Sequence, residues 1–406
     1  MTDENNIRRT PKPDPEKKEK EKNAKISVAV LLGLVVLIVA VTFFIANADG
    51  FFPGQETTTK MNVVEINQGE SKDSVQSPSS SANGFPISFK NGAIESAACV
   101  NSCVFVLTHD AVTCVSATGK IIFTYSLGFS DPSLKVSDNY AIVYDRQGSE
   151  FTVFNTKGLY FKGQSDEEGK ILTACVSNDG KAIIASRRTG SASALAVYTK
   201  NKGSDFAWAC AKEHILSLDI TKNGKTLACA AIGSTGGEIY TKCYVFDLAK
   251  KKSVAARTFQ SSSPTDCIIE SSYIHLVCTD KSIMFDYTDK SKEAVTVDFS
   301  STVIKRACDK DGNVAVLTKK VDSFGDNEVS FYDSNNIHVY SVTVPDKVCD
   351  LKISGSDVCV LTTSQLLIIN SKGKISKEID VESASDGMAA DSRRYYRYYL
   401  GVLYLI

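Results

Sequence analysis

The residue types that most often carry chemistry are dispersed along this chain. Its 406 residues include twelve cysteines and four histidines, and no two cysteines form a CxxC pair. Zinc sites depend on such closely spaced ligands, so the spacing argues against one. No Ser/His/Asp arrangement follows from the spacing of His109, His214, His275 and His338. His275 alternates with apolar residues, which is typical of a buried or edge position in a strand. We therefore predict no catalytic residue, no metal ligand and no cofactor-binding residue.

The twelve cysteines admit two interpretations. In an exported domain they could form disulfides, because the outside of a cell can be oxidising. Free cysteine also packs as a small apolar residue, and neighbouring repeats have Ala, Val, Ile or Leu at the related positions. Those on expected first strands are Cys99, Cys175, Cys267, Cys308 and Cys349, and those on second strands are Cys103, Cys229, Cys278 and Cys359. The pattern favours packing and leaves cross-strand disulfides Cys267–Cys278 and Cys349–Cys359 open.

Acidic residues suggest two further kinds of site. A glycosidase needs two carboxyl groups about 5–10 Å apart. Four acids lie on or beside expected first strands, namely Glu95, Asp219, Asp266 and Asp350. Any two that converge at a channel mouth would allow such chemistry. The stretch "DKDGN" (Asp309–Asn313) has the carboxylate spacing of a calcium loop but no Glu at the twelfth position. Asp, Asn and Gly also suit a tight turn, which is the interpretation we adopt.

Two aromatic stretches are candidate contact surfaces. "SRRYYRYYL" (Ser392–Leu400) mixes Arg and Tyr, which can stack on nucleic acid or glycans. As a strand, it would pack Tyr on the neighbouring sheet and leave Arg in solvent, and this is the interpretation we favour. The one tryptophan, Trp208, lies on an expected outer strand, where it either anchors a partner or packs. With 46 basic and 47 acidic residues, the chain has no charge excess that would attract nucleic acid.

The elements that must position these residues are many short strands. After Ile94 the apolar runs are short, rich in Val and Ile and bounded by turn residues, without a long helical period. Similar phrases recur at "SNDGKAIIAS" (Ser177–Ser186), "TKNGKTLACA" (Thr221–Ala230) and "DKDGNVAVLT" (Asp309–Thr318). Equivalent turns are expected at 101–102, 138–139, 179–180, 223–224, 271–272, 311–312 and 355–356. Their spacing of roughly 40 residues is that of a four-stranded propeller blade.

The two ends of this region predict an eighth blade. The tail, 386–406, divides into an inner strand, a turn near 391–392, a second strand "RRYYRYYL" and a third strand "VLYLI". A strand at Phe85–Phe89 can then fill the outermost place and close the ring, which leaves no open sheet edge between the chain ends. We predict an all-β, eight-bladed β-propeller over residues 85–406. A seven-bladed ring with the tail packed elsewhere is the alternative.

The N-terminal residues predict a membrane anchor. Residues 1–25 are polar and rich in Lys, Glu and Pro, as in a disordered leader. Residues 26–46 are uncharged and apolar over a length that spans a bilayer as a helix. Eight Lys or Arg precede this run and none follows until Lys60, so the N-terminus is expected in the cytoplasm and the rest outside. Residues 47–84 are rich in Ser and Thr and predict a flexible stalk. Cleavage after Ala48, as in a signal peptide, is the alternative.

Two resemblances follow from these residues. "YVFD" (Tyr244–Asp247) and "SFYD" (Ser330–Asp333) resemble the third strand of a WD-type blade, but the Trp and the Gly-His pair of that motif are missing. Quinoprotein-type rings carry a recurring Trp and this chain has one, so a quinone cofactor is not expected. The basic leader, anchor, Ser-rich stalk and blades such as "DPSLKVSDNYAIVYD" are similar to an uncharacterised family of single-pass, membrane-anchored propeller proteins of Gram-positive anaerobic bacteria. That resemblance implies architecture and a plasma-membrane location, not a reaction.

The architecture and the missing catalytic motifs together predict a non-enzymatic role, although a fold alone does not determine function. We expect an interaction or scaffolding module of the cell envelope, anchored by residues 26–46 with its C-terminal domain outside. A protein or a cell-wall glycan would bind one propeller face, and no nucleic acid is expected. The alternative is an envelope glycan hydrolase or lyase with carboxylates at the channel mouth. A third hypothesis is a sensor that couples outside binding to the cytoplasmic leader.

Overall fold

The computed structural model describes residues 84–90, 92–165, 169–299, 301–319, 327–344, 347–382 and 384–406. All of them belong to the unit Glu56–Ile406, the second of two into which the chain divides. The predicted leader (1–25), anchor (26–46) and all but the last residue of the predicted stalk (47–84) lie outside the described residues. Within the described ranges, no helix has the length and apolarity that a membrane crossing requires.

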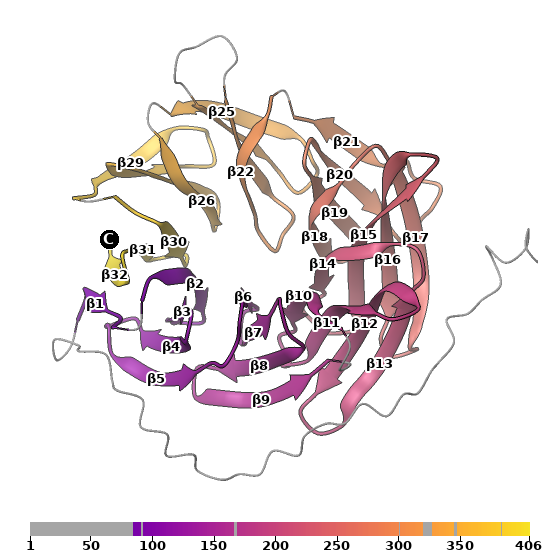
Figure 1. Cartoon of the computed structure of the whole chain (residues 1–406). Coiled ribbons are helices and arrows are strands. Elements are labelled where there is room, and N and C mark those ends of the chain that lie inside the picture. Colours follow the sequence, from indigo (N-terminus) through magenta and orange to yellow (C-terminus); the bar gives the residue numbers. More distant parts are fainter. Residues whose placement is uncertain are drawn as a thin grey trace, which may run out of the picture. The chain divides into compact units, whose positions relative to one another are not determined.

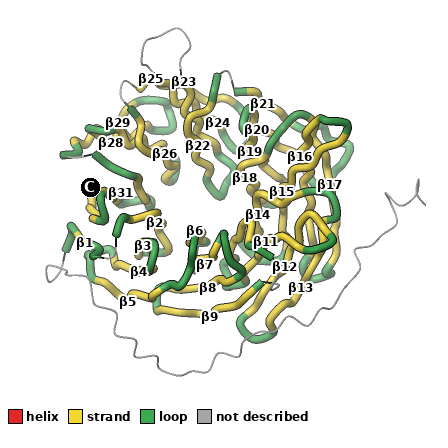
Figure 2. Tube along the Cα trace, viewed as in Figure 1, coloured by secondary structure: helices red, strands yellow, loops and turns green. Residues whose placement is uncertain are grey.

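The described residues form eight four-stranded antiparallel sheets arranged as a ring (Figure 1). In seven of these sheets the chain completes one sheet before it enters the next, and the first strand lies nearest the centre; the eighth sheet combines the last three strands with β1. Figure 2 shows that the strands of the ring are joined by loops and turns. The eight-bladed propeller is therefore confirmed, and the seven-bladed alternative is excluded by the eighth sheet.

Each blade begins with an innermost strand and ends with an outermost strand at the rim. Blade 1 contains β2 (Ile94–Val100), β3 (Cys103–Thr108), β4 (Ala111–Ser116) and β5 (Ile121–Ser126). Blade 2 contains β6 (Pro132–Val136), β7 (Ala141–Asp145), β8 (Glu150–Asn155) and β9 (Gly158–Gln164). Blade 3 contains β10 (Ile171–Val176), β11 (Ala182–Arg188), β12 (Ser191–Thr199) and β13 (Gly203–Cys210). Blade 4 contains β14 (His214–Ile220), β15 (Thr226–Thr235), β16 (Glu238–Asp247) and β17 (Lys252–Gln260).

The second half of the ring repeats this order. Blade 5 contains β18 (Pro264–Glu270), β19 (Tyr273–Cys278), β20 (Lys281–Asp286) and β21 (Val295–Asp298). Blade 6 contains β22 (Val303–Cys308), β23 (Val314–Lys319), β24 (Asn327–Tyr332) and β25 (His338–Val344). Blade 7 contains β26 (Val348–Ser354), β27 (Asp357–Thr362), β28 (Gln365–Ile369) and β29 (Ile375–Asp380). Blade 8 contains β30 (Gly387–Ala390), β31 (Tyr395–Tyr399), β32 (Val402–Leu405) and β1 (Ile87–Ser88).

Blade 8 joins the two ends of the described chain. β1 pairs antiparallel with β32, with Ile87 opposite Leu403 and Ser88 opposite Val402. β1 therefore occupies the outermost place of the blade, where the sequence places the strand Phe85–Phe89. Ile87 is completely buried beside Leu403 and Tyr396. This pairing ties the first described residues to the last strand of the ring.

The core lies between the blades rather than inside any one of them. The second strand of a blade is buried on both faces, as in β3, β23 and β27. Such strands read as continuous apolar runs because each face packs against a neighbouring blade. The fourth strands form the rim and are less buried than the second strands, and β29 is exposed along almost its whole length. This gradient from centre to rim explains the apolar and polar runs in the sequence.

The repeated turns connect the innermost strand of each blade to the second. All seven expected turns lie between these strands, and an eighth lies between β30 and β31. In "DKDGN" the Asp309 carboxylate accepts hydrogen bonds from the backbone N–H groups of Asp311 and Asn313, both at 2.9 Å. Gly312 has φ 87°, and a Cβ there would lie 2.5 Å from Nε2 of His275. The tight-turn interpretation is confirmed, because the Asp309 carboxylate holds the turn itself.

All twelve cysteines carry free thiols, and seven of them are buried. Cys267 lies opposite Leu276, and Cys278 lies opposite Pro264. Cys359 lies opposite Lys352. The two cross-strand disulfides that the sequence leaves open are therefore not formed, and the packing interpretation describes the structure.

Candidate binding site at the collar end of the ring

The innermost strands define two ends of the ring. The turns that lead from the innermost to the second strands lie at one end, which we call the turn end. Each innermost strand begins at the other end, which we call the collar end. Many innermost-strand side chains are partly exposed, for example in β2 and β22, although these strands lie at the centre of the ring (Figure 1). Solvent therefore reaches the axis.

The turn end is bridged across the axis by charged side chains. Nζ of Lys310 in blade 6 lies 2.8 Å from Oδ1 of Asp138 in blade 2, which is the opposite blade of the ring. Nζ of Lys222 in blade 4 lies 3.1 Å from Oδ1 of Asp311 in blade 6. We call these four residues the cross-ring cluster. Of the ion pairs between described residues, these two join blades that are not neighbours, so side chains span the axis at this end.

Neighbouring turns support the cross-ring cluster. The backbone N–H of Asn101 donates to the carbonyl of Asp138, and the backbone N–H of Asp138 donates to the side chain of Asn178. The hydrogen bond from Lys310 holds the pKa of Asp138 below its usual range, and burial opposes this effect only in part. The hydrogen bond to Asp311 raises the pKa of Lys222. Asp138 and Lys222 therefore both carry their charge at neutral pH.

The collar end carries a repeated β-bulge. In six of the eight innermost strands a residue near the start has no partner on the neighbouring strand, so two residues oppose one. A bulge of this kind redirects a side chain and is frequent next to binding sites. We call the unpaired residues the collar; they are Glu95, Leu172, Leu216, Thr265, Ile304 and Cys349.

The collar is mostly apolar and reaches solvent. Ile304 is 48% exposed and Leu216 is 39% exposed, although both belong to innermost strands. Leu172, Thr265 and Cys349 are partly exposed. Because each innermost strand is packed between two neighbouring blades, solvent contacts these side chains from the axis or from the collar end. The collar therefore offers aliphatic surface at one mouth of the ring.

Below the collar, polar side chains join successive innermost strands. Ser217 in blade 4 accepts a hydrogen bond from the backbone N–H of Cys267 in blade 5, at 3.0 Å. Asp350 in blade 7 accepts from the backbone N–H of Met388 in blade 8, at 2.9 Å. The inner edge of a sheet leaves such N–H groups without a ladder partner, and a buried one is costly unless it is satisfied. These acids and hydroxyls therefore stabilise the ring.

The four acids proposed from the sequence are all on innermost strands, but each has a separate partner. Glu95 lies 3.5 Å from His109, and Asp266 lies 3.7 Å from Arg306. Asp350 accepts two backbone N–H bonds and lies 3.7 Å from Lys352. No contact between described residues joins two of these carboxylates, and no group of three or more metal-ligating side chains among the described residues is arranged to hold an ion.

Asp219 differs from the other three acids. It accepts a hydrogen bond from the backbone N–H of Ile269 in the next blade, at 2.9 Å. Protein atoms surround the carboxyl group closely, and this desolvation raises its pKa to about 6, against the lowering effect of the backbone bonds. A raised pKa is what a catalytic general acid needs. The carboxyl group of Asp219 is, however, used as a hydrogen-bond acceptor that links blades 4 and 5.

A buried carboxylate that the sequence did not reveal lies between blades 3 and 4. Glu213 accepts hydrogen bonds from the hydroxyl groups of Tyr240 (2.9 Å) and Tyr244 (3.0 Å) and from the thiol of Cys210 (3.1 Å). Burial alone would raise its pKa, but these hydrogen bonds and Lys242, 3.7 Å away, hold it below the usual value. Both tyrosines lie on β16, far from Glu213 in the sequence. The local sequence around Glu213 therefore does not indicate this cluster.

The remaining candidates from the sequence are structural. Trp208 packs on Tyr244 and Phe246, with ring centroids 4.7 and 5.0 Å apart. His275 is buried, and desolvation lowers its pKa to about 4, so it is neutral at pH 7. In "SRRYYRYYL", Tyr396 and Tyr398 are buried as expected.

One expectation about "SRRYYRYYL" is wrong. Arg397 was expected in solvent, but its side chain is buried and its guanidinium lies 4.0 Å from the centroid of the Tyr404 ring. The long stem and planar head of arginine can pack over an aromatic face. The strand β31 is therefore covered on both faces and is not a basic contact surface.

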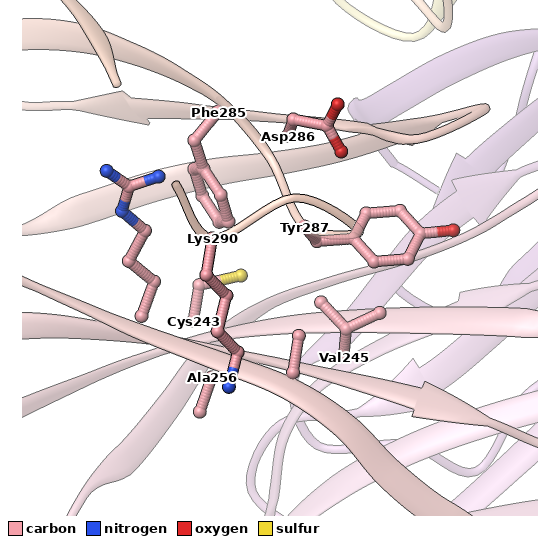
Figure 3. A pocket seen from close by; sticks show the side chains of 9 residues that line it. Cys243, Val245, Ala256, Phe285, Asp286, Tyr287 and Lys290 are labelled. Carbon is pink, nitrogen blue, oxygen red and sulfur yellow. The ribbon is translucent and has the colours of Figure 1, made fainter. Parts of the chain in front are cut away.

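A small pocket lies away from the axis, between blades 4 and 5. Its volume is about 150 Å³, and Cys243 and Val245 of β16 face Phe285 and Tyr287 across it (Figure 3). The carboxylate of Asp286 beside it is already engaged by Thr288 and Lys292. The pocket opens between two blades, and its volume and mainly apolar lining suit a small apolar group.

Fold and site together define a β-propeller whose inner acids are engaged within the ring and whose collar end exposes several aliphatic side chains. The chain belongs to the family of unknown function DUF5711, whose pattern matches residues 83–400. No curated protein matches the chain.

Solved structures share the fold at low sequence identity. BamB from Moraxella catarrhalis is 14% identical, with a TM-score of 0.52, over 80% of this chain and 96% of that one. The C-terminal WD40 domain of Sif2 is 11% identical, with a TM-score of 0.54, over 79% and 98%. Apo AztD from Citrobacter koseri is 12% identical, with a TM-score of 0.53, over 76% and 89%. At this identity the similarity establishes the propeller fold alone.

Proposed function

We propose that this protein is a non-enzymatic interaction module of the cell envelope that binds a protein partner at the collar end of its propeller. Residues 26–46 would anchor it in the plasma membrane, with the leader 1–25 in the cytoplasm and the propeller outside. The observation that carries the proposal is the difference between the two ends of the ring. Charged side chains bridge one end, and exposed aliphatic side chains line the other.

The collar fits a protein better than a glycan. Sugar hydroxyl groups that lose water against aliphatic side chains must find new hydrogen-bond partners, and leaving them without partners is costly. Leu216 and Ile304 offer none. Protein surfaces present apolar side chains that such a collar can bury favourably. We therefore propose a protein partner, and the experiment below would also detect a glycan.

The inner acids are already engaged within the ring, which favours the non-enzymatic role over the enzyme alternative. A glycan hydrolase needs two carboxyl groups about 5–10 Å apart on either side of the bond it cleaves. Asp266 faces Arg306, and Asp350 is held by backbone N–H groups. Asp219 has a raised pKa but lies near the end of β14 that leads to the turn, away from the collar. The acids thus act as ties between blades.

Site-specific photo-crosslinking in intact cells tests the proposal. Benzoylphenylalanine would replace Ile304 in the collar, Asp311 at the turn end or Val254 on the outermost strand β17, each in the full chain. We expect a protein adduct from position 304 and none from the other two. Equal adducts from all three positions, or an adduct from 311 alone, would contradict the proposed surface. A glycan adduct, intact or shortened, would replace the protein partner with a lectin or an enzyme.

A further inference from the structure

The collar has a charged neighbour, Lys305, that forms no ion pair among the described residues. Lys305 follows Ile304 directly on β22 and is partly exposed. No carboxylate among the described residues lies within ion-pair distance of its ammonium. The acids at the same level are engaged elsewhere, Asp266 with Arg306 and Asp350 with Lys352. Around blades 4 to 6 this mouth of the ring therefore presents aliphatic surface beside one ammonium group, while the collar's carboxylate, Glu95, lies in blade 1 next to His109.

The turn end limits what can enter. The ion pairs Lys310–Asp138 and Lys222–Asp311 span the axis there. A chain that enters at the collar end and continues along the axis would have to displace these ion pairs. A loop tip or a chain terminus can bind at the collar without displacing them.

We infer that the collar binds a protein segment in which a bulky apolar side chain stands next to a carboxylate, presented as a loop tip or a chain end. Apolar side chains of the segment would contact Leu216 of blade 4 and Ile304 of blade 6, and the carboxylate would pair with Lys305 beside Ile304. Charge complementarity selects the acidic neighbour, since a basic segment would face Lys305 with like charge. This inference rests on the proposed function and specifies its partner.

The test uses the full chain in phospholipid nanodiscs and a phage-displayed library of random linear peptides as the probe. We expect the selected peptides to carry Asp, Glu or a free C-terminal carboxylate beside a large aliphatic or aromatic residue. Binding of one selected peptide would then be measured by fluorescence anisotropy. Leu216→Ser and Ile304→Ser should each weaken it about tenfold or more, because each removes buried apolar contact.

The charge variant makes the test specific. Lys305→Glu should weaken the acidic peptide at least about tenfold and should favour a version of the peptide in which Lys replaces the acid. Val254→Ser is the matched control, since Val254 is 40% exposed on β17 at the rim of blade 4. It should leave binding unchanged, and the thermal unfolding of all variants should confirm that they are folded.

The outcomes separate this inference from the function on which it rests. Peptides that depend on Leu216 and Ile304 but bind equally well to Lys305→Glu would overturn the acidic partner and leave the collar as the binding surface. Selected peptides that bind every collar variant as well as the wild type would overturn both. A library that yields no collar-dependent peptide would likewise overturn the inference, while the crosslink at position 304 would still decide the proposed function.

Discussion

At the scale of single residues, Asp219 shows how a propeller uses an acid to join two blades. Its carboxyl group accepts the Ile269 N–H and so ties blade 4 to blade 5 beside the axis. Desolvation raises its pKa from 3.8 to about 6. The carboxyl group is therefore ionised at pH 7 at a cost in stability, since the folded protein binds its proton more tightly than the unfolded chain does.

The change Asp219→Asn tests this cost. In the wild type, the contribution of Asp219 is most favourable below pH 4 and declines as the pH rises towards about 6. The size of this decline is at most about 3 kcal/mol, at 1.36 kcal/mol per pKa unit. Asparagine keeps an oxygen that can accept the Ile269 N–H but carries no charge. We expect the variant to be more stable than the wild type at pH 7.5 and to lose that advantage at pH 4, measured by urea unfolding.

The neighbouring acid supplies the control. Asp266→Asn removes a carboxylate that lies 3.7 Å from Arg306, so it should not stabilise the protein at pH 7.5. If Asp219→Asn instead destabilised the protein at all pH values, the carboxylate would be a required ionic partner and the desolvation argument would fail.

At the scale of elements, the closing strand β1 is short but holds the first and last described strands together. Ile87→Asp places a carboxylate where the side chain is fully buried against Leu403. We expect the change to cost about 3 kcal/mol or more, as for an unpaired charge in a core. Hydrogen exchange should rise first in β32 and β31, the strands that β1 covers. Guanidinium unfolding would give the total loss.

Ser88→Asp is the matched substitution, because Ser88 is exposed on the same strand. It should leave the free energy of unfolding within about 0.5 kcal/mol of the wild type. Exchange that rose uniformly over all eight blades in Ile87→Asp would show that the ring opens as one unit rather than at blade 8.

Elements were also the level at which the sequence was most informative. The pairs Asp179-Gly180 and Asn223-Gly224 predicted turns, because glycine readily adopts a positive φ. The two glycines have φ 81° and 66° in the structure. The collar was not predicted, although six innermost strands share an order of apolar residue, bulged residue and polar residue, as in "ILS" and "VIK". A bulge shifts register by one residue, and only the paired strand reveals that shift.

Contacts between blades were beyond the reach of sequence reasoning. Asp138 and Lys310 are 172 residues apart, and their pairing depends on how eight blades close around one axis. Glu213 likewise receives two of its hydrogen bonds from β16, on the far side of a hairpin. The conformational preferences of neighbouring residues predict turns and strands, but they carry no information about partners in other blades.

At the scale of the whole molecule, the cross-ring cluster joins opposite sides of the ring. Lys310→Glu places like charges at Asp138, and Asp138→Lys does the same at Lys310. Each single change should lower the melting temperature, while the double reversal should recover part of the loss. Because both side chains are about half exposed, the coupling energy should be about 0.5 kcal/mol at low salt and smaller at high salt. A coupling of zero at low salt would mean that the pair does not hold the turn end together.

The orientation in the envelope is the proposal on which the function at the collar depends. Lys60 and Lys72 are the first basic residues after the run 26–46, and the described propeller begins beyond them. If the propeller lies outside the membrane, trypsin added to intact cells should cut at one of these residues and release a fragment that contains the propeller. Folded strands resist the protease because cleavage needs an opened backbone. A fragment that appears only after lysis would place the propeller inside the cell and exclude an envelope partner, whereas release without protease would indicate cleavage near Ala48.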